Sequence, residues 1–168
     1  HKFKPLAAFL PMQRPFRPRA RRIEIANFPC MYKLFHRTLK SPGNLNNEIG
    51  LPLTILRLGP GYERAVLEMG FYVPGEIAFL CDISLPSVGI ITNVGTVHAE
   101  RAGSQEAIFT GKSELVQSLP PAPQGTAILN FDDPWVRKME EKTRARVFFY
   151  GLSSEAHLCA YYIQGLGL

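Results

Sequence analysis

The sequence predicts an α/β fold: a three-layer, mostly parallel, doubly wound sheet with helices on both faces. Strand-like and helix-like segments alternate at least three times after about residue 35, which is typical of βαβ units. Residues 87–95 form a continuous apolar run of the kind found in strands buried inside parallel sheets. Polar side chains also follow several predicted strands, where ligands bind in such sheets.

The first half of this pattern starts with a short strand at 35–41. A helix-like apolar run at 49–58 follows, and the chain enters it through the amide-rich sequence GNLNNE. Residues 63–70 read as a strand rich in side chains that are usually buried. Residues 73–83 have helical spacing, and Pro74 suits the first turn of a helix.

The second half continues the alternation. The run at 87–95 is a strand, and 104–119 is an amphipathic helix with Ser104 as its N-cap. Residues 160–168 are interpreted as a further strand that is cut short. The elements between them are a strand at 125–130, a helix at 133–143 with Pro134 near its start, and a strand at 145–151.

The charge distribution divides the chain into two parts. Residues 1–40 contain ten Lys or Arg and one acidic residue, a net charge of +9, whereas the remainder carries −4. Prolines interrupt the beginning of the chain every few residues, so we expect a poor helix or strand there. We therefore predict a basic, Pro-rich head at 1–36, non-homologous or disordered, and a partial domain at 37–168.

The basic head permits two interpretations. It could be an arm that binds nucleic acid or an anionic surface, or a solvated tail. We favour the tail and do not expect nucleic acid as a partner, because a single cluster of charge is weak evidence for binding.

Composition favours a soluble globular protein. The apolar fraction is 46% and the charged fraction is 20%, both ordinary for that class. No apolar run is long enough for a membrane span, and no secretory signal is recognisable, so we expect a cytoplasmic protein without a membrane partner. Cys30, Cys81 and Cys159 are widely spaced and are expected to be free thiols.

Polar residues gather where three predicted strands end. Glu68 follows the apolar part of the second strand at 63–67, and Asn93 and His98 follow that of the third at 88–92. Asn130, Asp132 and Asp133 follow that of the fourth at 126–129. A carboxylate and an imidazole at adjacent strand ends can share a divalent cation, and a carboxylate-rich site that also binds phosphate suits Mg²⁺. The alternatives are a solvated or paired Glu68 and a hydrogen-bonded loop histidine at 98.

Other candidates have simple structural explanations. Lys112 lies on the amphipathic helix, where a lysine is usually a surface residue with its charged end in water. The asparagines at 44, 46 and 47 can cap the following helix, but a cap needs only one or two of the three. Asp132 and Asp133 can cap the helix that starts at Pro134.

Five sequence blocks together resemble a known family. In order they are GNLNNEIGLPLT, VLEMGFYVPGEIAFLCDI, ITNVGTVHAERAGS, GKSEL and ILNFDDP. They resemble the central, ATP-binding domain of the Mur ligases over roughly residues 37–160, and look most like the branch that adds D-alanyl-D-alanine to UDP-N-acetylmuramoyl (UDP-MurNAc) tripeptide. The resemblance implies ATP and Mg²⁺ as cofactors, these two substrates as partners, and an acyl-phosphate mechanism in the bacterial cytoplasm.

The resemblance also assigns roles to residues of this chain. Glu68 and His98 match metal ligands, and Lys112 matches a lysine that is carbamylated and adds an anionic ligand near the metal. His98 and Lys112 are therefore the catalytic candidates. The nucleotide- or substrate-binding candidates are Asn44, Asn47, Asn93, Asn130, Asp132 and Asp133, with Phe131 replacing the alanine of the family's NADD sequence.

One departure from the family concerns the phosphates. No glycine precedes Gly43, and the G-K-S at 111–113 lies within a predicted helix, so the family's phosphate-binding loop is absent from this sequence. We therefore expect a ligase fragment that is inactive alone. The alternatives are a non-catalytic Mur-ligase-like binding protein and a related folylpolyglutamate- or cyanophycin-type ligase. The oligomeric state does not follow from the sequence.

Overall fold

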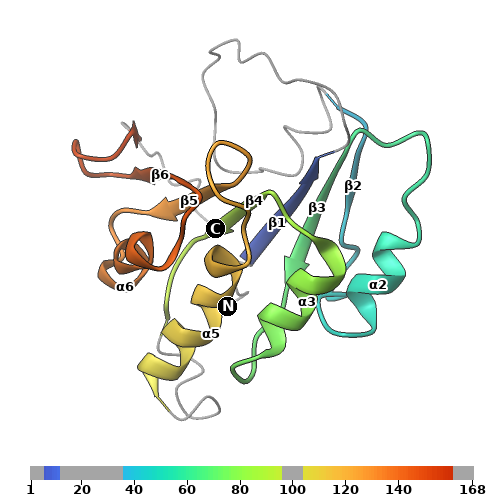
Figure 1. Cartoon of the computed structure of the whole chain (residues 1–168), viewed down its shortest axis with the longest axis horizontal. Coiled ribbons are helices and arrows are strands. Elements are labelled where there is room, and N and C mark those ends of the chain that lie inside the picture. The colour runs from blue at the N-terminus through green and yellow to red at the C-terminus, as the bar shows by residue number, and fades with distance from the viewer. Residues whose placement is uncertain (1–5, 12–35, 96–103, 161–168) are drawn as a thin grey trace, which may run out of the picture.

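A seven-stranded sheet organises the chain in a computed structural model that describes residues 6–11, 36–95 and 104–160. Its strand order is β2-β3-β1-β4-β5-β6-β7, and Figure 1 shows β1 and β3 running side by side in the middle of the molecule. The strands are β1 (Leu6–Pro11), β2 (Thr38–Lys40), β3 (Arg64–Met69), β4 (Val88–Ile91), β5 (Thr126–Asn130), β6 (Arg146–Gly151) and β7 (Leu158–Cys159).

The sheet is parallel except at β1. This strand pairs antiparallel with both β3 and β4, and Leu6 lies opposite Met69 while Pro11 lies opposite Arg64. The other neighbouring strands pair in parallel. The amino end of β1 therefore lies at the edge of the sheet where β3 and β4 end.

The strand β1 corrects one expectation from the sequence. We expected the beginning of the chain to form no regular element, because prolines interrupt it. Residues 6–11 nevertheless pair with two strands at once. Within LAAFLP the only proline is the last residue, so the interior of the strand keeps its backbone N–H donors.

The helices match the expected segments, with shorter bounds. They are α2 (Gly50–Ile55), α3 (Glu76–Ser84), α5 (Gln105–Gln117), α6 (Pro134–Arg137) and the 3₁₀ helix η2 (Lys138–Lys142). The single helix expected at 133–143 is thus one turn of α-helix that continues as 3₁₀. The strand expected at 160–168 lies outside the described residues apart from Ala160, and the two-residue β7 precedes it.

Alternation along β3 assigns the two faces of the sheet. Leu67 and Met69 belong to the main core, whereas Val66 belongs to a smaller cluster with Ile90. Each α-helix of the described residues contributes to the main core through buried side chains, namely Leu51, Ile77, Leu80, Ile108, Leu115, Val116 and Val136. Figure 1 shows α3 and α5 lying over the sheet on this face. No helix within residues 36–95 and 104–160 contributes to the smaller cluster.

The helix α5 has the expected N-cap. The Oγ of Ser104 accepts a hydrogen bond from the backbone N–H of Ala107 over 3.1 Å. Among the described residues, no helix has both the length and the apolar character that crossing a bilayer requires.

Candidate functional site at the carboxyl ends of the strands

Lys112 reaches from α5 to the end of β4. Its Nζ donates a hydrogen bond to the backbone oxygen of Asn93 over 2.7 Å and lies 3.4 Å from the Oδ1 of the same residue. The side chain is half-buried. Two residues that the sequence nominated separately are therefore in contact, and the lysine is directed at a strand end instead of lying along the surface.

The surroundings of Lys112 favour its uncharged form. Burial lowers the pKa of its amine from the ordinary value of 10.5, and the carboxylate of Asp133 partly opposes this shift. A lysine with a lowered pKa has a larger neutral fraction, and the neutral amine is the nucleophilic form.

The glycine before Lys112 serves packing. A Cβ at Gly111 would overlap the ring of Phe71, so the ring lies directly against α5 at this point. The space that the missing side chain leaves beside Lys112 is therefore filled by the aromatic ring.

Glu68 is held at the end of β3 by two polar neighbours. Its Oε1 accepts a hydrogen bond from the Nδ2 of Asn46 over 2.9 Å. Its backbone N–H donates to the Oγ of Ser41 over 3.0 Å, and the backbone N–H of Gly70 donates to the carbonyl oxygen of Asn46 over 2.7 Å. Asn46 is the member of the amide cluster that sequence reasoning missed; the surplus of amides over what a helix cap needs was the available signal.

The other two asparagines separate into a cap and a free side chain. The Oδ1 of Asn47 accepts hydrogen bonds from the backbone N–H groups of Gly50, over 2.8 Å, and Ile49, over 3.3 Å, at the start of α2. Asn44 is exposed, and in the described part of the chain its side chain makes no hydrogen bond. The expectation that a cap would use only part of the cluster is confirmed.

The segment after β5 ties neighbouring elements together. The Nδ2 of Asn130 donates to the carbonyl oxygen of Thr92 over 2.9 Å. The Oδ2 of Asp133 accepts from the backbone N–H of Val94 over 2.8 Å, and its Oδ1 accepts from the N–H groups of Trp135 and Val136. The capping interpretation of Asp133 is confirmed, and the same carboxylate also fixes the exit from β4.

Asp132 has a different role from its neighbour. Its carboxylate accepts hydrogen bonds from the backbone N–H groups of Leu152, over 2.7 Å, and Ser153, over 3.2 Å, just after β6. It therefore anchors the β6–β7 turn and is not the cap of α6 that the sequence allowed.

The candidates form two groups at one edge of the sheet. Lys112, Asn93 and Asp133 gather around the ends of β4 and β5, whereas Glu68 and Asn46 lie at the end of β3. No hydrogen bond or ion pair joins Glu68 to Lys112 within the described residues. His98 lies outside those residues.

The described residues at this edge complete a site for neither of the two implied cofactors. Among the residues that the structure describes, no three His, Cys, Asp or Glu side chains are close enough to hold a metal ion. A phosphate-binding loop follows the carboxyl end of a strand, but the central β1 presents its amino end at this edge. The described residues therefore do not supply the phosphate cradle that ATP requires.

Sequence reasoning also missed Glu114. Its Oε1 accepts a hydrogen bond from the backbone N–H of Gly75 over 2.6 Å, and its Oε2 accepts from the N–H of Ala78 over 3.0 Å. The carboxylate on α5 thus caps the amino end of α3. Gly75, the backbone N-cap of α3, has φ of +99°, a conformation that favours glycine. A cap supplied from 39 residues away in the chain leaves no local signal in the sequence.

Comparison with known proteins decides the family. The family model of the Mur ligase middle domain matches residues 25–165. The chain belongs to this family. The match begins within the basic head, and it confirms the resemblance and the fold class that the sequence predicted.

Among the relatives of this Mur ligase middle domain is the UDP-N-acetylmuramoyl-tripeptide--D-alanyl-D-alanine ligase of Synechocystis. It is 41% identical over 119 residues, which cover 70% of this chain and 26% of the relative. The chain thus spans about a quarter of the length of the curated relatives that it matches.

Solved structures give the same result. MurF from Acinetobacter baumannii is similar with a TM-score of 0.67 and 32% identity, over 72% of this chain and 26% of that one. MurF ligase from Thermotoga maritima, solved in complex with ADP, has a TM-score of 0.64 and 38% identity over 73% of this chain and 28% of that one.

Proposed function

We propose that this chain represents part of the middle domain of an ATP-dependent amide-bond-forming ligase of peptidoglycan precursor synthesis. The whole enzyme would add D-Ala-D-Ala to UDP-MurNAc-tripeptide through an acyl-phosphate, in the bacterial cytoplasm. The observation that carries this proposal is the 41% identity over 119 residues to a ligase of that specificity. The nucleotide is supported by the ADP bound to the Thermotoga maritima relative.

Lys112 is proposed as a carbamylated residue. Its neutral amine would attack CO₂, forming an N–C bond and releasing a proton, and the product is a carbamate with one negative charge. The lowered pKa of the amine supports this step, because only the unprotonated amine has a free electron pair. The contact with Asn93 would hold the modified group at the strand end.

Glu68 and His98 are proposed as the other ligands of a divalent cation. Glu68 keeps one carboxylate oxygen free of the hydrogen bond to Asn46, so it can offer that oxygen to a metal. When bound, Mg²⁺ would neutralise charge that builds up on a transferred phosphoryl group. The described residues alone do not complete this site.

The amide and carboxylate candidates differ in whether their side chains already make hydrogen bonds within the chain. Asn44 is the best placed of them to meet a substrate, because its side chain is exposed and makes no hydrogen bond within the described residues. Asn47, Asn93, Asn130, Asp132 and Asp133 already hold backbone groups or Lys112, so we propose that they act on substrate or nucleotide mainly by fixing the strand ends.

We expect the chain alone not to turn over ATP. A missing phosphate loop removes several backbone donors and a lysine that would stabilise the transferred phosphoryl group. The test is phosphate release in the presence of ATP, Mg²⁺, UDP-MurNAc-tripeptide and D-Ala-D-Ala, with the full-length Thermotoga maritima ligase as positive control. Turnover at a rate similar to that ligase would contradict the expectation.

A second candidate function is non-catalytic binding. The ordered hydrogen bonds at the strand ends, combined with the lack of a phosphate cradle among the described residues, favour a protein that binds without reacting. Calorimetric titration of the chain with UDP-MurNAc-tripeptide tests this candidate. Binding supports it, and the absence of binding removes it.

A further inference from the structure

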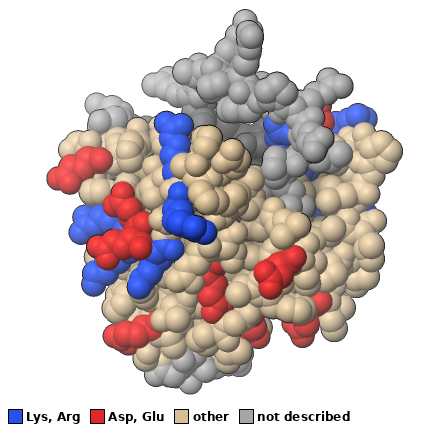
Figure 2. Space-filling model, viewed as in Figure 1, with Lys and Arg blue, Asp and Glu red and all other residues tan. Residues whose placement is uncertain are grey.

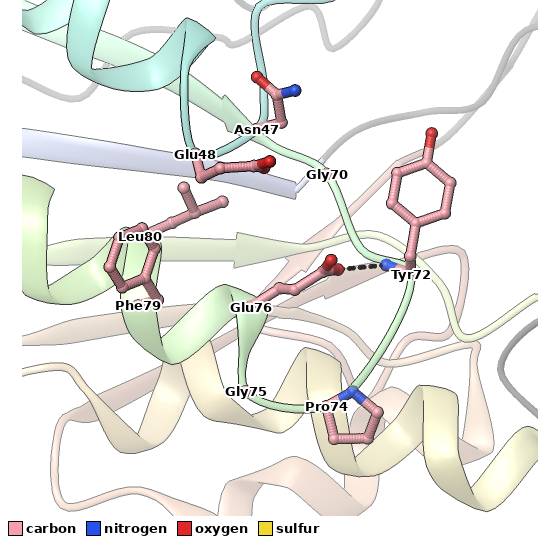
Figure 3. A pocket seen from close by; sticks show the side chains of 9 residues that line it. All are labelled: Asn47, Glu48, Gly70, Tyr72, Pro74, Gly75, Glu76, Phe79 and Leu80. Atoms are coloured by element: carbon pink, nitrogen blue, oxygen red, sulfur yellow. Dashed lines mark hydrogen bonds between the residues drawn. The ribbon is translucent and has the colours of Figure 1, made fainter.

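A cavity of about 360 Å³ lies beside the candidate site, between the end of β3 and the start of α3. Figure 3 shows its lining, which comes from the loop before α2, the segment after β3 and the first turns of α3. The lining residues are Asn47, Glu48, Gly70, Tyr72, Pro74, Gly75, Glu76, Phe79 and Leu80.

The charged side chains of the described lining are all acidic. Glu48 and Glu76 line the cavity, and none of its described lining residues is Lys, Arg or His. Figure 2 shows acidic side chains over the region of α3 with no Lys or Arg beside them, whereas on the side of α6 Lys and Arg lie among Asp and Glu. The cavity therefore favours a cationic group over an anionic one.

The two carboxylates differ in how they are held. The Oε2 of Glu76 accepts hydrogen bonds from the backbone N–H groups of Tyr72, over 2.7 Å, and Val73, over 3.1 Å, so its orientation is fixed and its Oε1 remains available. Glu48 makes no hydrogen bond or ion pair in the described part of the chain. Figure 3 shows both side chains on the cavity wall.

The amino end of α3 does not turn the cavity into an anion site. The N–H groups of Gly75 and Ala78 would be natural donors to an anion, but both already donate to the carboxylate of Glu114. This third carboxylate adds negative charge directly behind the wall.

The remaining walls are apolar or aromatic. Phe79 is 52% exposed and Tyr72 is 54% exposed, although Leu80 beside them is buried. Exposed aromatic rings next to carboxylates suit a cation on an aliphatic stem, since the stem covers the rings while the charge meets the carboxylates.

We propose that this cavity binds a primary alkylammonium group that carries no carboxylate next to the amine. Glu48 and Glu76 pair with the ammonium, and Tyr72 and Phe79 contact its methylene chain. A zwitterionic end would place its own carboxylate among Glu48, Glu76 and Glu114, and the described lining residues offer it no cationic partner. The proposal does not rest on ligase activity.

The test is titration of the purified chain, followed by amide NMR. The probes are 1,5-diaminopentane as a free amine, Nα-acetyl-lysine amide as a peptide side chain, and 2,6-diaminopimelate as an amine beside a carboxylate. We expect the first two to shift the amide signals of Gly70, Tyr72 and Gly75, with millimolar affinity, and the third to bind more weakly. Whichever of the first two binds more tightly identifies the source as free amine or peptide.

Matched variants locate the binding. Glu48→Gln removes a charge that makes no internal contact, and Glu76→Gln keeps an acceptor for the backbone N–H groups. Each is expected to weaken binding about 2- to 5-fold, in line with partly exposed ion pairs. Asp82→Asn, on the same helix but outside the lining, should leave affinity unchanged.

Three results would overturn the proposal. One is equal binding of 2,6-diaminopimelate and Nα-acetyl-lysine amide. Another is equal binding of Nα-acetyl-norleucine amide, which lacks the amine. The last is an unchanged affinity in both glutamine variants.

Discussion

The Nζ of Lys112 on α5 donates a hydrogen bond to the backbone oxygen of Asn93, at the end of β4, over 2.7 Å. This contact joins a helix that covers the sheet to the strand end where ligands bind in parallel α/β folds. It explains why a lysine is half-buried on an amphipathic helix, and it places the amine of Lys112 at the candidate site.

The first prediction concerns the pH dependence of stability through Lys112. Burial lowers the pKa of Lys112 in the folded chain below its ordinary value of 10.5. Between the lowered pKa and about 10.5, the unfolded chain therefore binds more protons, so the free energy of unfolding rises with pH over that window. At pH values below the lowered pKa, Lys112 is charged in both the folded and the unfolded chain. The full cost of burying this charge then lowers the free energy of unfolding.

Lys112→Met removes this titration. The free energy of unfolding of both proteins is measured by urea denaturation between about pH 7 and 10.5. As the pH rises, the value for the original chain should increase relative to the value for the variant. Parallel curves for the two proteins would mean that the lysine titrates normally in the folded state.

A second prediction compares two adjacent aspartates. Asp133→Ala leaves three backbone N–H groups without their acceptor, those of Val94, Trp135 and Val136. We expect a loss of about 2–3 kcal/mol in the free energy of unfolding. Asp132→Ala removes hydrogen bonds from an exposed turn and should cost about 1 kcal/mol. Chemical denaturation measures both, and a larger loss for Asp132→Ala would argue against the structure.

A third prediction tests the cap that α5 supplies to α3. Glu114→Ala removes the acceptor of the Gly75 and Ala78 N–H groups and a negative charge at a helix amino end. The expected cost is about 1–2 kcal/mol. The control is Asp82→Ala on the exposed face of α3, which should not destabilise the chain. Equal losses in the two variants would contradict the cap.

A fourth prediction concerns the thiols. Cys81 is 2% exposed, and burial raises the pKa of its thiol to about 12. Cys159 is half-buried, at the edge of the sheet. In the folded chain at about pH 8, iodoacetamide should modify Cys159 much faster than Cys81, because the thiolate is the reactive form.

Peptide mapping by mass spectrometry after timed quenching follows each cysteine separately. In urea the difference between Cys81 and Cys159 should disappear. Rapid modification of Cys81 without denaturant would show that this part of the core opens easily.

The sequence predicted the alternating elements of residues 36–151 because each has a local pattern. The caps by Ser104 and Asp133 and the apolar strand β4 are examples, since the N-caps lie within three residues of their partners. The sequence also predicted that the site lies at the strand ends. The carboxyl ends of parallel strands lie at one edge of the sheet, and polar residues follow them there.

The features that the sequence did not predict depend on long-range contacts. β1 lies in a basic, proline-rich stretch, and only its pairing with β3 and β4 makes it a strand. Asn46 meets Glu68 across 22 residues, and Glu114 caps α3 across 39 residues. Such contacts follow from the packing of whole elements, so no short stretch of sequence encodes them.

The most direct test of the account is whether Lys112 carries a carbamate. The chain is equilibrated with carbon-13-labelled bicarbonate at about pH 8, and the carbamate carbon is observed by NMR. We predict a carbamate signal that is absent from Lys112→Arg, whose guanidinium stays protonated. An original chain with no such signal, or a variant with the same signal, would contradict the proposed role of Lys112.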